Sequence, residues 1–450
     1  MTGIVAEPPV MTAIVAGPPV GLYVHVPFCL SICPYCDFVV VAGAEARGPA
    51  NRVASFVAAL LVELDLRADA LDARFGLPVV GGMAKAGRPP LQTVYLGGGT
   101  PSLLPSSALA EIIDRVRGRF GLAPDAEVTL EANPGPDERG DPVAQRLAGV
   151  TRISFGAQSL VAAELPALGR RHAPRHVAEA VQAARAAGVQ SVNIDLLYDT
   201  PGQSLASWTE SLERALELEP DHLSLYALQL DDPDAEGLTG PAGDHLPVRP
   251  GARRWRARAA RTQDEDRAAA MYHLAVHRLA EAGFRGYELS NWAKPGYESR
   301  HNLSYWERRS VEAVGPGAHA FDGVVRRWNA ARLDGYLAAL LPGTHGTVGV
   351  PGTRGARGGP EALVLSQMPA RLPPGSVESP LDTAAAAAET LILGLRLDGG
   401  VPLTAILDPI VADVFAWAAE ANLVEPAPND HVRLTTQGRL LSNEIFSRLL

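Results

Sequence analysis

The chain has 450 residues, of which 47% are hydrophobic and 20% are charged, and its formal net charge is -10. This length predicts either one large α/β domain with attachments or two to three domains. No run of about 18 apolar residues occurs, so we expect no transmembrane helix. A basic surface supplies most of the affinity for nucleic acid, so the acidic balance argues against a general nucleic-acid binder.

The N-terminus contains two near-repeats, MTGIVAEPPV and MTAIVAGPPV. The repetition indicates a duplicated start, with Met11 as the alternative initiator to Met1. No basic residue precedes the short apolar run, so the segment lacks the positive region of a secretory signal, and we expect a cytoplasmic protein. We expect residues 1–20 to form a mobile tail.

Residues 21 to about 228 alternate short apolar runs with amphipathic stretches. The apolar runs are β-branched or aromatic and bounded by turns, which predicts six buried strands at 21–26, 92–98, 127–132, 152–158, 191–198 and 223–228. Helical periodicity predicts helices at 52–68, 107–120, 176–188 and 205–218. This alternation favours a parallel sheet with right-handed crossovers, either an open sheet or a partial barrel. Ligands of such folds gather at the carboxyl ends of the strands.

The core is expected to extend over 21–335, with an insertion at about 231–263. Pro, Gly and Asp dominate its first part, and the basic block RPGARRWRARAAR (249–261) is expected to be solvated. A helix at about 265–282 and a strand near 284–290 would complete this domain.

Two further segments follow the core. Residues 341–380 are so rich in Gly and Pro that we expect a disordered linker. Residues 381–450 show the order helix, helix, strand, helix, which resembles a small winged-helix module. This module lacks a basic recognition helix, which favours a structural role over DNA binding.

All three cysteines of the chain lie in CLSICPYC (29–36). Cys33 and Cys36 could form a redox pair, or the three thiols could join His25 in a zinc site. A disulfide is disfavoured in a cytosolic chain, and His25 lies inside a predicted strand. An iron–sulfur cubane fits better, because iron prefers thiolates and Pro34 keeps the segment a loop. Three ligands would leave one iron open to a chelating cosubstrate.

The segment GGGTPS (97–102) follows the QTVYL stretch of the second predicted strand. Its glycines allow backbone groups to approach a ligand closely, and they equally suit a tight strand-to-helix turn, since Pro101 and Ser102 favour a helix start. Polar residues recur at or just past the following strand ends. Each alone is an ordinary surface residue, but together they suit a charged small molecule: Glu131, Gln158, Arg170 and Asp195.

The CxxxCxxC spacing after a first strand, followed by GGGTPS, resembles the radical S-adenosylmethionine (SAM) superfamily. The resemblance implies an α/β fold, a partial (β/α)6 TIM-like barrel, with a [4Fe-4S] cluster on Cys29, Cys33 and Cys36. It also implies that the methionine part of SAM chelates the free iron and that an electron from the cluster splits the sulfonium to give a deoxyadenosyl radical. By position it assigns the SAM pocket to Tyr23, Tyr35, Gly98, Gly99, Thr100, Glu131, Gln158, Arg170, Asp195 and Ala227.

The motifs YVHVPFCLSICPYCDF, LEANPGP, LGRRH and NIDLLYDTPGQ narrow the resemblance. They are similar to the oxygen-independent coproporphyrinogen III oxidase group, and especially to its haem chaperone branch. The oxidases carry another cysteine two residues after the third, where this chain has Phe38, and they have a longer N-terminal region. Both departures put porphyrinogen decarboxylation in doubt and leave enzymatic activity uncertain.

The stretch SRHNLSYW (299–306) matches the HNxxYW motif that is associated with haem binding in the chaperone branch. The resemblance implies a haem site at His301, Asn302, Tyr305 and Trp306, with His301 as axial ligand. Tyr305 would share the face of His301 on a helix, and Trp306 would offer an apolar plate. Without that resemblance, a histidine near two aromatic residues is more often structural. His172 and His319 are left unassigned.

These patterns predict a protein that binds haem and passes it to an apo-haemoprotein of unknown identity. The alternative function is radical oxidation of coproporphyrinogen III in porphyrin biosynthesis. We expect no nucleic-acid partner, and the pattern is compatible with a homodimer and with peripheral membrane contact.

Overall fold

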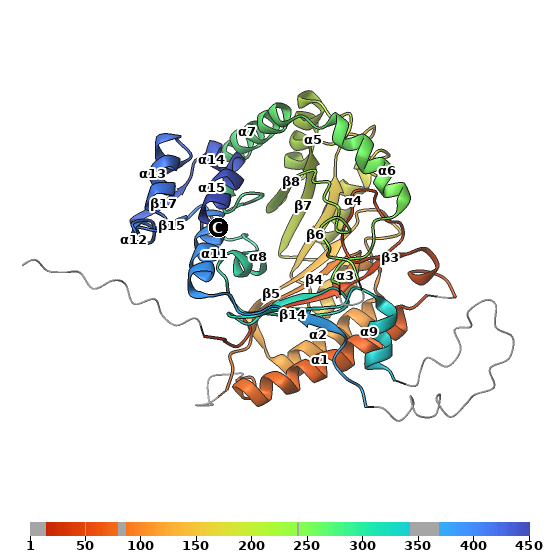
Figure 1. Ribbon diagram of the computed structural model, residues 1–450. Helices are drawn as coiled ribbons and strands as arrows, with labels where there is room; N and C mark the ends of the chain where they lie inside the picture. The colour runs from red at the N-terminus through yellow and green to blue at the C-terminus, as the bar shows by residue number, and fades with distance from the viewer. Residues whose placement is uncertain (1–14, 50, 80–86, 241–242, 343–368) are drawn as a thin grey trace, which may run out of the picture.

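The computed structural model describes residues 15–49, 51–79, 87–240, 243–342 and 369–450. A curved twelve-stranded sheet lies at its centre, helices cover one face of that sheet, and the C-terminal module packs at the side (Figure 1). Within the described ranges, no helix is long and apolar enough to cross a membrane.

Six parallel strands form the middle of the sheet, as the sequence predicts. They run in chain order and are β1 (Gly21–Val26), β4 (Leu91–Gly98), β5 (Leu122–Ala132), β6 (Arg152–Gln158), β7 (Ser191–Tyr198) and β8 (His222–Ala227). The register pairs Tyr23 with Tyr95 between β1 and β4. Parallel pairing places the carboxyl ends of all six strands at one edge, which positions the site.

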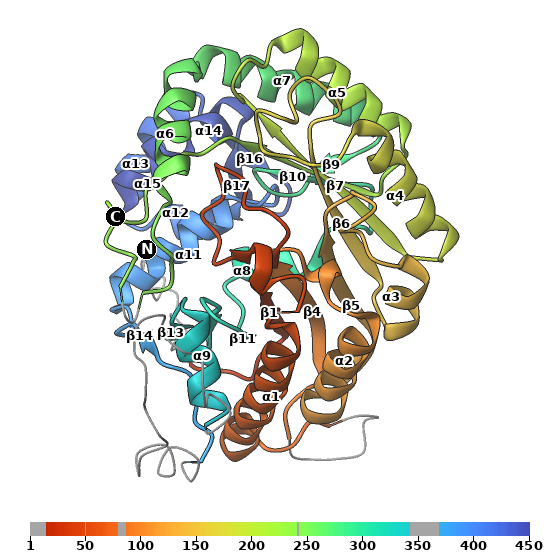
Figure 2. The ribbon, with the colours of Figure 1, turned by 90° about the vertical axis from the view of Figure 1, so that its right-hand side faces the viewer.

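The helices form an outer arc around the strands (Figure 2). They are α1 (Val53–Phe75), α2 (Ser106–Phe120), α3 (Pro142–Ala148), α4 (Pro174–Ala186), α5 (Leu205–Glu217) and α7 (Glu265–Glu281). Successive side chains of each strand point alternately towards these helices and towards the concave face of the curved sheet. In β1, Leu22 and Val24 are fully buried in the apolar core that also contains Phe56 of α1.

The concave face of the sheet, called the lumen below, carries polar side chains. Asn193 Nδ2 lies 2.6 Å from Ser154 Oγ, and its Oδ1 lies 2.7 Å from His222 Nδ1. Tyr23 and His25 belong to the same face of β1 and join through a 3.1 Å hydrogen bond. A polar, hydrogen-bonded lumen suits a charged ligand better than an apolar one.

Shorter strands extend both sides of the sheet, and most of them were not predicted. β11 (Val311–Val314) pairs in parallel with β1, and β12 (His319–Phe321), β13 (Arg326–Asn329) and β14 (Gly375–Val377) continue in antiparallel order. On the far side, β10 (Asn291–Ala293) and β9 (Arg285–Gly286) follow β8. The predicted strand near 284–290 therefore shrinks to β9.

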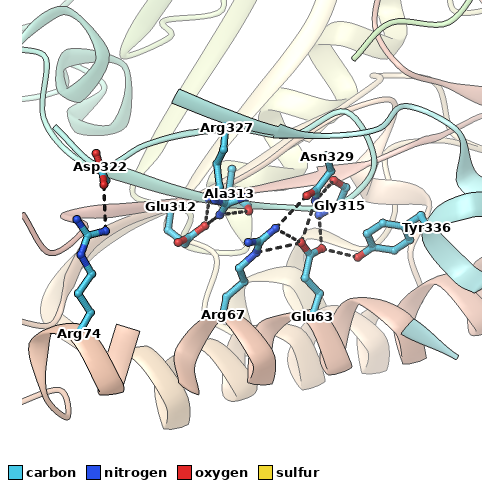
Figure 3. Close-up of polar contacts among 10 residues, drawn as sticks. All are labelled: Glu63, Arg67, Arg74, Glu312, Ala313, Gly315, Asp322, Arg327, Asn329 and Tyr336. Atoms are coloured by element: carbon cyan, nitrogen blue, oxygen red, sulfur yellow. Dashed lines mark hydrogen bonds and ion pairs between the residues drawn. The ribbon is translucent and has the colours of Figure 1, made fainter. Parts of the chain in front are cut away.

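A buried polar network joins α1 to this extension (Figure 3). The Glu63 carboxylate is fully buried and accepts from Asn329 Nδ2, the Gly315 amide and the Tyr336 hydroxyl, each at 2.8 Å, and from Arg67 at 3.3 Å. Tyr336 lies on α9 (Leu333–Leu340). One carboxylate thus ties a helix, a strand, a loop and a second helix together.

Three expectations about connecting segments need correction. Of the tail expected at 1–20, residues 1–14 lie outside the described residues, but Gly17 is docked, since its amide donates to Asp322 O (2.8 Å) and its carbonyl accepts from Ser310 Oγ (2.9 Å). Of the linker expected at 341–380, residues 343–368 lie outside the described part, and β14 joins the sheet through backbone pairing.

The third correction concerns the insertion at 231–263. Residues Pro250–Ala259 form the helix α6 instead of a solvated loop. Arg256 of this helix is only 6% exposed, although Arg253, Arg254 and Arg258 are exposed as expected. Arg256 is buried because it contacts the backbone of the cysteine loop, which lies more than 200 residues earlier in the chain.

The C-terminal module has its own core and a three-stranded antiparallel sheet in the order β15-β17-β16, in keeping with the predicted winged-helix-like arrangement. Its elements are α11 (Thr383–Leu395), β15 (Val401–Pro402), α12 (Leu403–Ile406), α13 (Ala412–Glu420), β16 (Val424–Ala427), β17 (His431–Leu434), α14 (Thr436–Leu440) and α15 (Ser442–Leu449). Leu289, which follows β9, packs on this core and connects the module to the barrel.

Candidate cofactor and haem site

The three cysteines lie on the loop that leaves β1 at the carboxyl edge of the sheet. The loop begins with β2 (Phe28–Cys29), which pairs with β3 (Val41–Ala42), and residues 30–40 have no helix or strand. All three thiols are free and half-buried. The prediction that this segment stays a loop is therefore confirmed.

The glycine-rich turn after β4 packs directly beneath this loop. The Gly99 amide donates to Val26 O at 2.8 Å, and the Thr100 amide donates to Phe28 O at 2.7 Å. A Cβ on Gly99 would lie 2.6 Å from Phe28 O, and Gly98 has a φ of +105° that favours glycine. The turn needs glycine for backbone packing against the cysteine loop, which is the turn interpretation of GGGTPS.

Two of the three sulfurs accept hydrogen bonds from predicted site residues. The Thr100 hydroxyl lies 3.5 Å from Cys29 Sγ, and Arg170 Nη1 lies 3.4 Å from Cys33 Sγ. Asn133 connects the two donors, because its Nδ2 lies 3.1 Å from Thr100 Oγ1 while its Oδ1 accepts from Arg170. The sulfurs and the Arg170 guanidinium thus face one common region.

The geometry fits a cluster better than a single zinc ion. Within the described residues, no three His, Cys, Asp or Glu side chains are arranged to hold one metal ion. His25, the fourth zinc ligand considered, is buried with Nε2 2.7 Å from Val39 O. A cubane takes its thiolates at separate corners, so its cysteines need not converge on one point.

Burial disfavours the ionised form of two of the three thiols. Burial raises the pKa of Cys29 to about 11, against the opposing effect of the Thr100 hydrogen bond. Burial also raises the pKa of Cys36, and the neighbouring cysteines add to this effect. Cationic iron would stabilise the thiolates that burial alone disfavours.

Two carboxyl groups lie deeper in the lumen. Glu131 accepts from the Tyr95 hydroxyl (2.8 Å) and from the Gly98 amide (3.0 Å), yet burial, with a further contribution from Asp195, raises its pKa to about 7. Asp195 accepts from Ser154 Oγ at 3.0 Å, and burial raises its pKa too. Two nearby acidic groups with raised pKa values would be stabilised by a cationic ligand.

Of the remaining residues predicted for the SAM pocket, Tyr23 lies inside β1 beside Tyr95, and the others lie at the carboxyl edge of the sheet. A Cβ on Gly156 would meet Gln158 Nε2 at 3.0 Å and Arg170 Nη2 at 3.5 Å, so these two polar groups are neighbours. Tyr35 lies in the cysteine loop, with its ring 6.3 Å from the Trp255 ring. Ala227 is exposed at the end of β8 and pairs with Tyr198 of β7.

Sequence reasoning missed three residues at this site. Tyr95 and Asn133 hold predicted residues in place, and Arg256 binds the cysteine loop from α6. Tyr95 alternates with apolar neighbours in β4, so strand periodicity could have placed it in the lumen. Asn133 follows Glu131 in LEANPGP, but nothing local distinguishes it from a turn residue.

The HNxxYW motif forms the short helix α8 (Arg300–Trp306) at the opposite end of the lumen. His301 lies at the starts of β1 and β4, where its Nδ1 is 2.8 Å from Thr93 Oγ1 and its Nε2 is 2.9 Å from the Tyr305 hydroxyl. It is 1% exposed, and burial lowers its pKa to about 3. The structure therefore holds a neutral imidazole with both nitrogens engaged.

The other members of the motif point to different neighbours. Tyr305 shares the face of His301 as predicted, and the Asn302 amide lies 3.3 Å from the Tyr287 hydroxyl. The predicted apolar plate, Trp306, has the Arg396 guanidinium 4.3 Å above its ring centre. The motif thus connects the lumen to α11 of the C-terminal module.

Tyr95 lies between the two ends of the lumen. Its hydroxyl binds Glu131, and its ring stacks 5.2 Å from the His301 ring. The unassigned His172 is buried and bonded to Ala157 O at 3.1 Å, which indicates a structural role. His319 pairs with Asp244 at 2.9 Å on its Nε2 and stacks on Trp328.

A partial barrel with three loop cysteines at the carboxyl ends of its strands is the architecture of a radical SAM protein. Residues 23–215 match the family model of the radical SAM superfamily. Among solved structures, coproporphyrinogen III oxidase (HemN) from Escherichia coli, described as a radical SAM enzyme, superposes with a TM-score of 0.70 at 19% identity. The alignment covers 97% of this chain and 91% of that chain, so the two share a fold.

Sequence similarity extends further. The chain is 37% identical to the haem chaperone HemW of Mycobacterium tuberculosis strain H37Rv, over 96% of this chain and 95% of the relative. It is 37% identical to HemW of Escherichia coli, over 67% of this chain and 70% of the relative, and 29% identical to HemW of Bacillus subtilis, over 95% and 98%. The chain belongs to the HemW family within the radical SAM superfamily.

Proposed function

We propose that this protein is a haem chaperone, which binds haem and delivers it to an apo-haemoprotein. The observation that carries the proposal is the similarity to relatives named haem chaperone HemW over nearly the whole chain, C-terminal module included. The intact HNLSYW motif at 301–306 supports it, because, among the described residues, Nε2 of its histidine is bound only to the Tyr305 side-chain hydroxyl of the same motif.

In this proposal, Cys29, Cys33 and Cys36 hold a [4Fe-4S] cluster, and the strand ends hold SAM. When bound, the pair would supply one-electron reductive cleavage of SAM. The Arg170 guanidinium suits the methionine carboxylate, and Glu131 and Asp195 suit its cationic groups. The remaining positions of the proposed pocket are Tyr23, Tyr35, Gly98, Gly99, Thr100, Gln158 and Ala227.

Haem ligation by His301 requires one local rearrangement. A tautomer with its proton on Nδ1 donates to Thr93 and leaves Nε2 as the acceptor of the Tyr305 hydroxyl. Rotation of the Tyr305 side chain, which is 39% exposed, would free Nε2 as an iron ligand. The low pKa keeps the imidazole neutral, which is the form that binds iron. Asn302 and Trp306 would complete the haem-binding face.

Oxidation of coproporphyrinogen III is the second candidate, and the shared fold with HemN favours it. Phe38 opposes it, because this residue stands where the oxidases carry a further cysteine. Its side chain, which is 61% exposed beside the cysteine loop, is a hydrocarbon without a donor atom and offers no iron ligand there.

One anaerobic experiment separates the two functions. The cluster is reconstituted, and haem is titrated into wild type, His301→Ala, Tyr305→Phe and the exposed-site control His277→Ala. Coproporphyrinogen conversion is assayed with SAM and reductant in parallel. We expect the absorption signature of haem with an axial histidine to be lost in His301→Ala only. We expect Tyr305→Phe to bind haem more strongly, because phenylalanine has no hydroxyl to hydrogen-bond to His301 Nε2.

The contrary outcome is equally clear. The chaperone proposal would be overturned if the protein efficiently converted the propionate groups of coproporphyrinogen to vinyl groups and if His301→Ala bound haem as well as wild type does. A histidine signature that survives in His301→Ala and disappears in His319→Ala would move the ligand to the Asp244-paired histidine while keeping the function.

A further inference from the structure

Arg256 is the buried member of an otherwise solvated basic helix. On α6, Arg253, Arg254 and Arg258 are exposed, whereas Arg256 is 6% exposed. A guanidinium is rarely buried unless its donors find acceptors, because the loss of hydration costs several kcal/mol. The acceptors of Arg256 therefore indicate what the helix is built to hold.

Those acceptors are backbone carbonyls of the cysteine loop. Arg256 Nη2 lies 3.0 Å from Tyr35 O and 3.1 Å from Cys36 O, and its Nε lies 3.4 Å from Pro34 O. Its Nη1 donates to Asp231 O at the start of the insertion. One side chain thus holds three consecutive carbonyls that span the interval between Cys33 and Cys36.

The neighbouring residues of α6 support the same loop. Trp255 Nε1 donates to Ala167 O at 2.9 Å, and its ring is tilted against Tyr35. On the other side, a Cβ on Gly169 would lie 2.9 Å from Pro34 Cδ. The cysteine loop is therefore held between α6 and the segment that carries Arg170.

The charge of Arg256 has no acidic partner in the described part of the chain. Its acceptors are all carbonyls, and no described carboxylate lies within ion-pair distance of it. A buried cation without a counter-ion is unfavourable, so an anion at the cysteine loop would stabilise it. A cubane with three thiolate ligands is such an anion, and its negative charge grows on reduction.

We propose that Arg256 is a positioning residue for the iron–sulfur cluster. Its forked donors fix the backbone between Cys33 and Cys36, and its charge stabilises the reduced cluster and so raises the reduction potential. This inference rests on the cluster of the proposed function. Arg256 is then a built-in support for the cofactor, while Arg253, Arg254 and Arg258 of the same basic block remain exposed to solvent.

The test compares Arg256→Gln, Arg256→Lys and the exposed control Arg254→Gln in the full chain. The readouts are iron per chain after anaerobic reconstitution, the rate of iron loss to a chelator, and the midpoint potential. We expect Arg256→Gln to lose iron about tenfold faster, as removal of two or more buried hydrogen bonds implies, and to have a lower potential. Arg256→Lys should keep the potential near that of wild type but lose iron faster, because an ammonium lacks the fork.

Amide hydrogen exchange on the metal-free protein adds a readout that does not depend on the cluster. Faster exchange at residues 33–38 in Arg256→Gln, with unchanged exchange in α4 and α5, is expected for a loop-positioning role. Equal chelation rate and potential in wild type and Arg256→Gln would overturn the inference. Failure of wild type itself to assemble a cluster would instead overturn the cofactor part of the proposed function.

Discussion

His301 shows how burial sets the chemistry of a single side chain. The ring is 1% exposed and bonded at both nitrogens, and burial lowers its pKa from 6.5 to about 3. In the unfolded chain the same imidazole takes up a proton below its ordinary pKa. Its contribution to stability is therefore fully present above pH 6.5 and is lost as the pH falls towards 3.

Replacement of His301 by Asn should reduce the acid sensitivity of the metal-free protein. Between pH 7 and pH 5, wild type should lose about 2 kcal/mol more of its unfolding free energy than the variant, because the variant lacks this titration. Urea denaturation at both pH values measures the difference. His277→Asn, at an exposed position, serves as control, and identical pH dependence of wild type and His301→Asn would contradict the account.

Glu131 shows the opposite effect of burial, on an acid. Its pKa of about 7 means that ionisation is nearly complete only above neutral pH. If Glu131 contacts a cationic part of SAM, affinity should rise about tenfold from pH 6 to pH 8 as the ionised fraction rises. Anaerobic calorimetry of SAM binding to wild type and Glu131→Gln measures this. An unchanged pH profile in the variant would show that Glu131 does not bind the ligand.

At the scale of elements, the turn after β4 and the helix α2 use glycine for different reasons. Gly99 lies against two backbone carbonyls, Val26 O and Phe28 O, which cannot move without displacing the cysteine loop. Gly118 lies inside α2, where a Cβ would meet nothing within 4 Å. The same substitution should therefore have opposite consequences at the two sites.

Gly118→Ala should stabilise the protein by about 0.5–1 kcal/mol, because alanine has the higher helix propensity. Gly99→Ala should destabilise it and lower the iron content after reconstitution, because the Cβ would push on the backbone next to Cys29. Thermal unfolding and iron analysis of both variants test this pair. A Gly99→Ala protein with normal stability and normal iron content would refute the packing argument.

At the scale of the molecule, the Glu63 network decides how the edge strands join the barrel (Figure 3). Its partners Arg67, Gly315, Asn329 and Tyr336 come from α1 and from segments more than 250 residues later in the chain. Arg67 has one ion-pair partner among the described residues, which is Glu63. Loss of the carboxylate would leave the buried Arg67 cation without its ion-pair partner, with the neutral Asn329 side-chain oxygen as an acceptor.

Glu63→Ala should therefore lower the unfolding free energy by about 3–5 kcal/mol, the usual cost of breaking a buried pair. Asp114→Ala, which breaks the exposed pair with Arg117, should cost less than about 1 kcal/mol. Urea denaturation of the two variants beside wild type gives both values. Similar losses in both would show that the network contributes no more than a surface ion pair.

The sequence indicated the parts of the fold that depend on local pattern. The six central strands have continuous apolar runs, and the helices between them have regular periodicity, so both were predictable. The edge strands β11 to β13 were missed because VEAV, HAF and RRWN are short and lack a clear alternation. They are strands because each finds a partner in the folded chain: β11 pairs with β1, β12 pairs with β11, and β13 pairs with β12.

The candidate site also has features that local sequence predicts and features that only the folded chain decides. The spacing of Cys29, Cys33 and Cys36, the glycine turn and the HNLSYW motif are written in consecutive residues, so the sequence by itself determined the class of protein and its candidate ligands. Tertiary structure alone decided that His301 is buried against Thr93, and that Arg256 holds the cysteine loop. The His301–Thr93 and Arg256–Tyr35 contacts join residues about 200 positions apart, and burial and hydrogen bonding between such residues arise only when the chain folds.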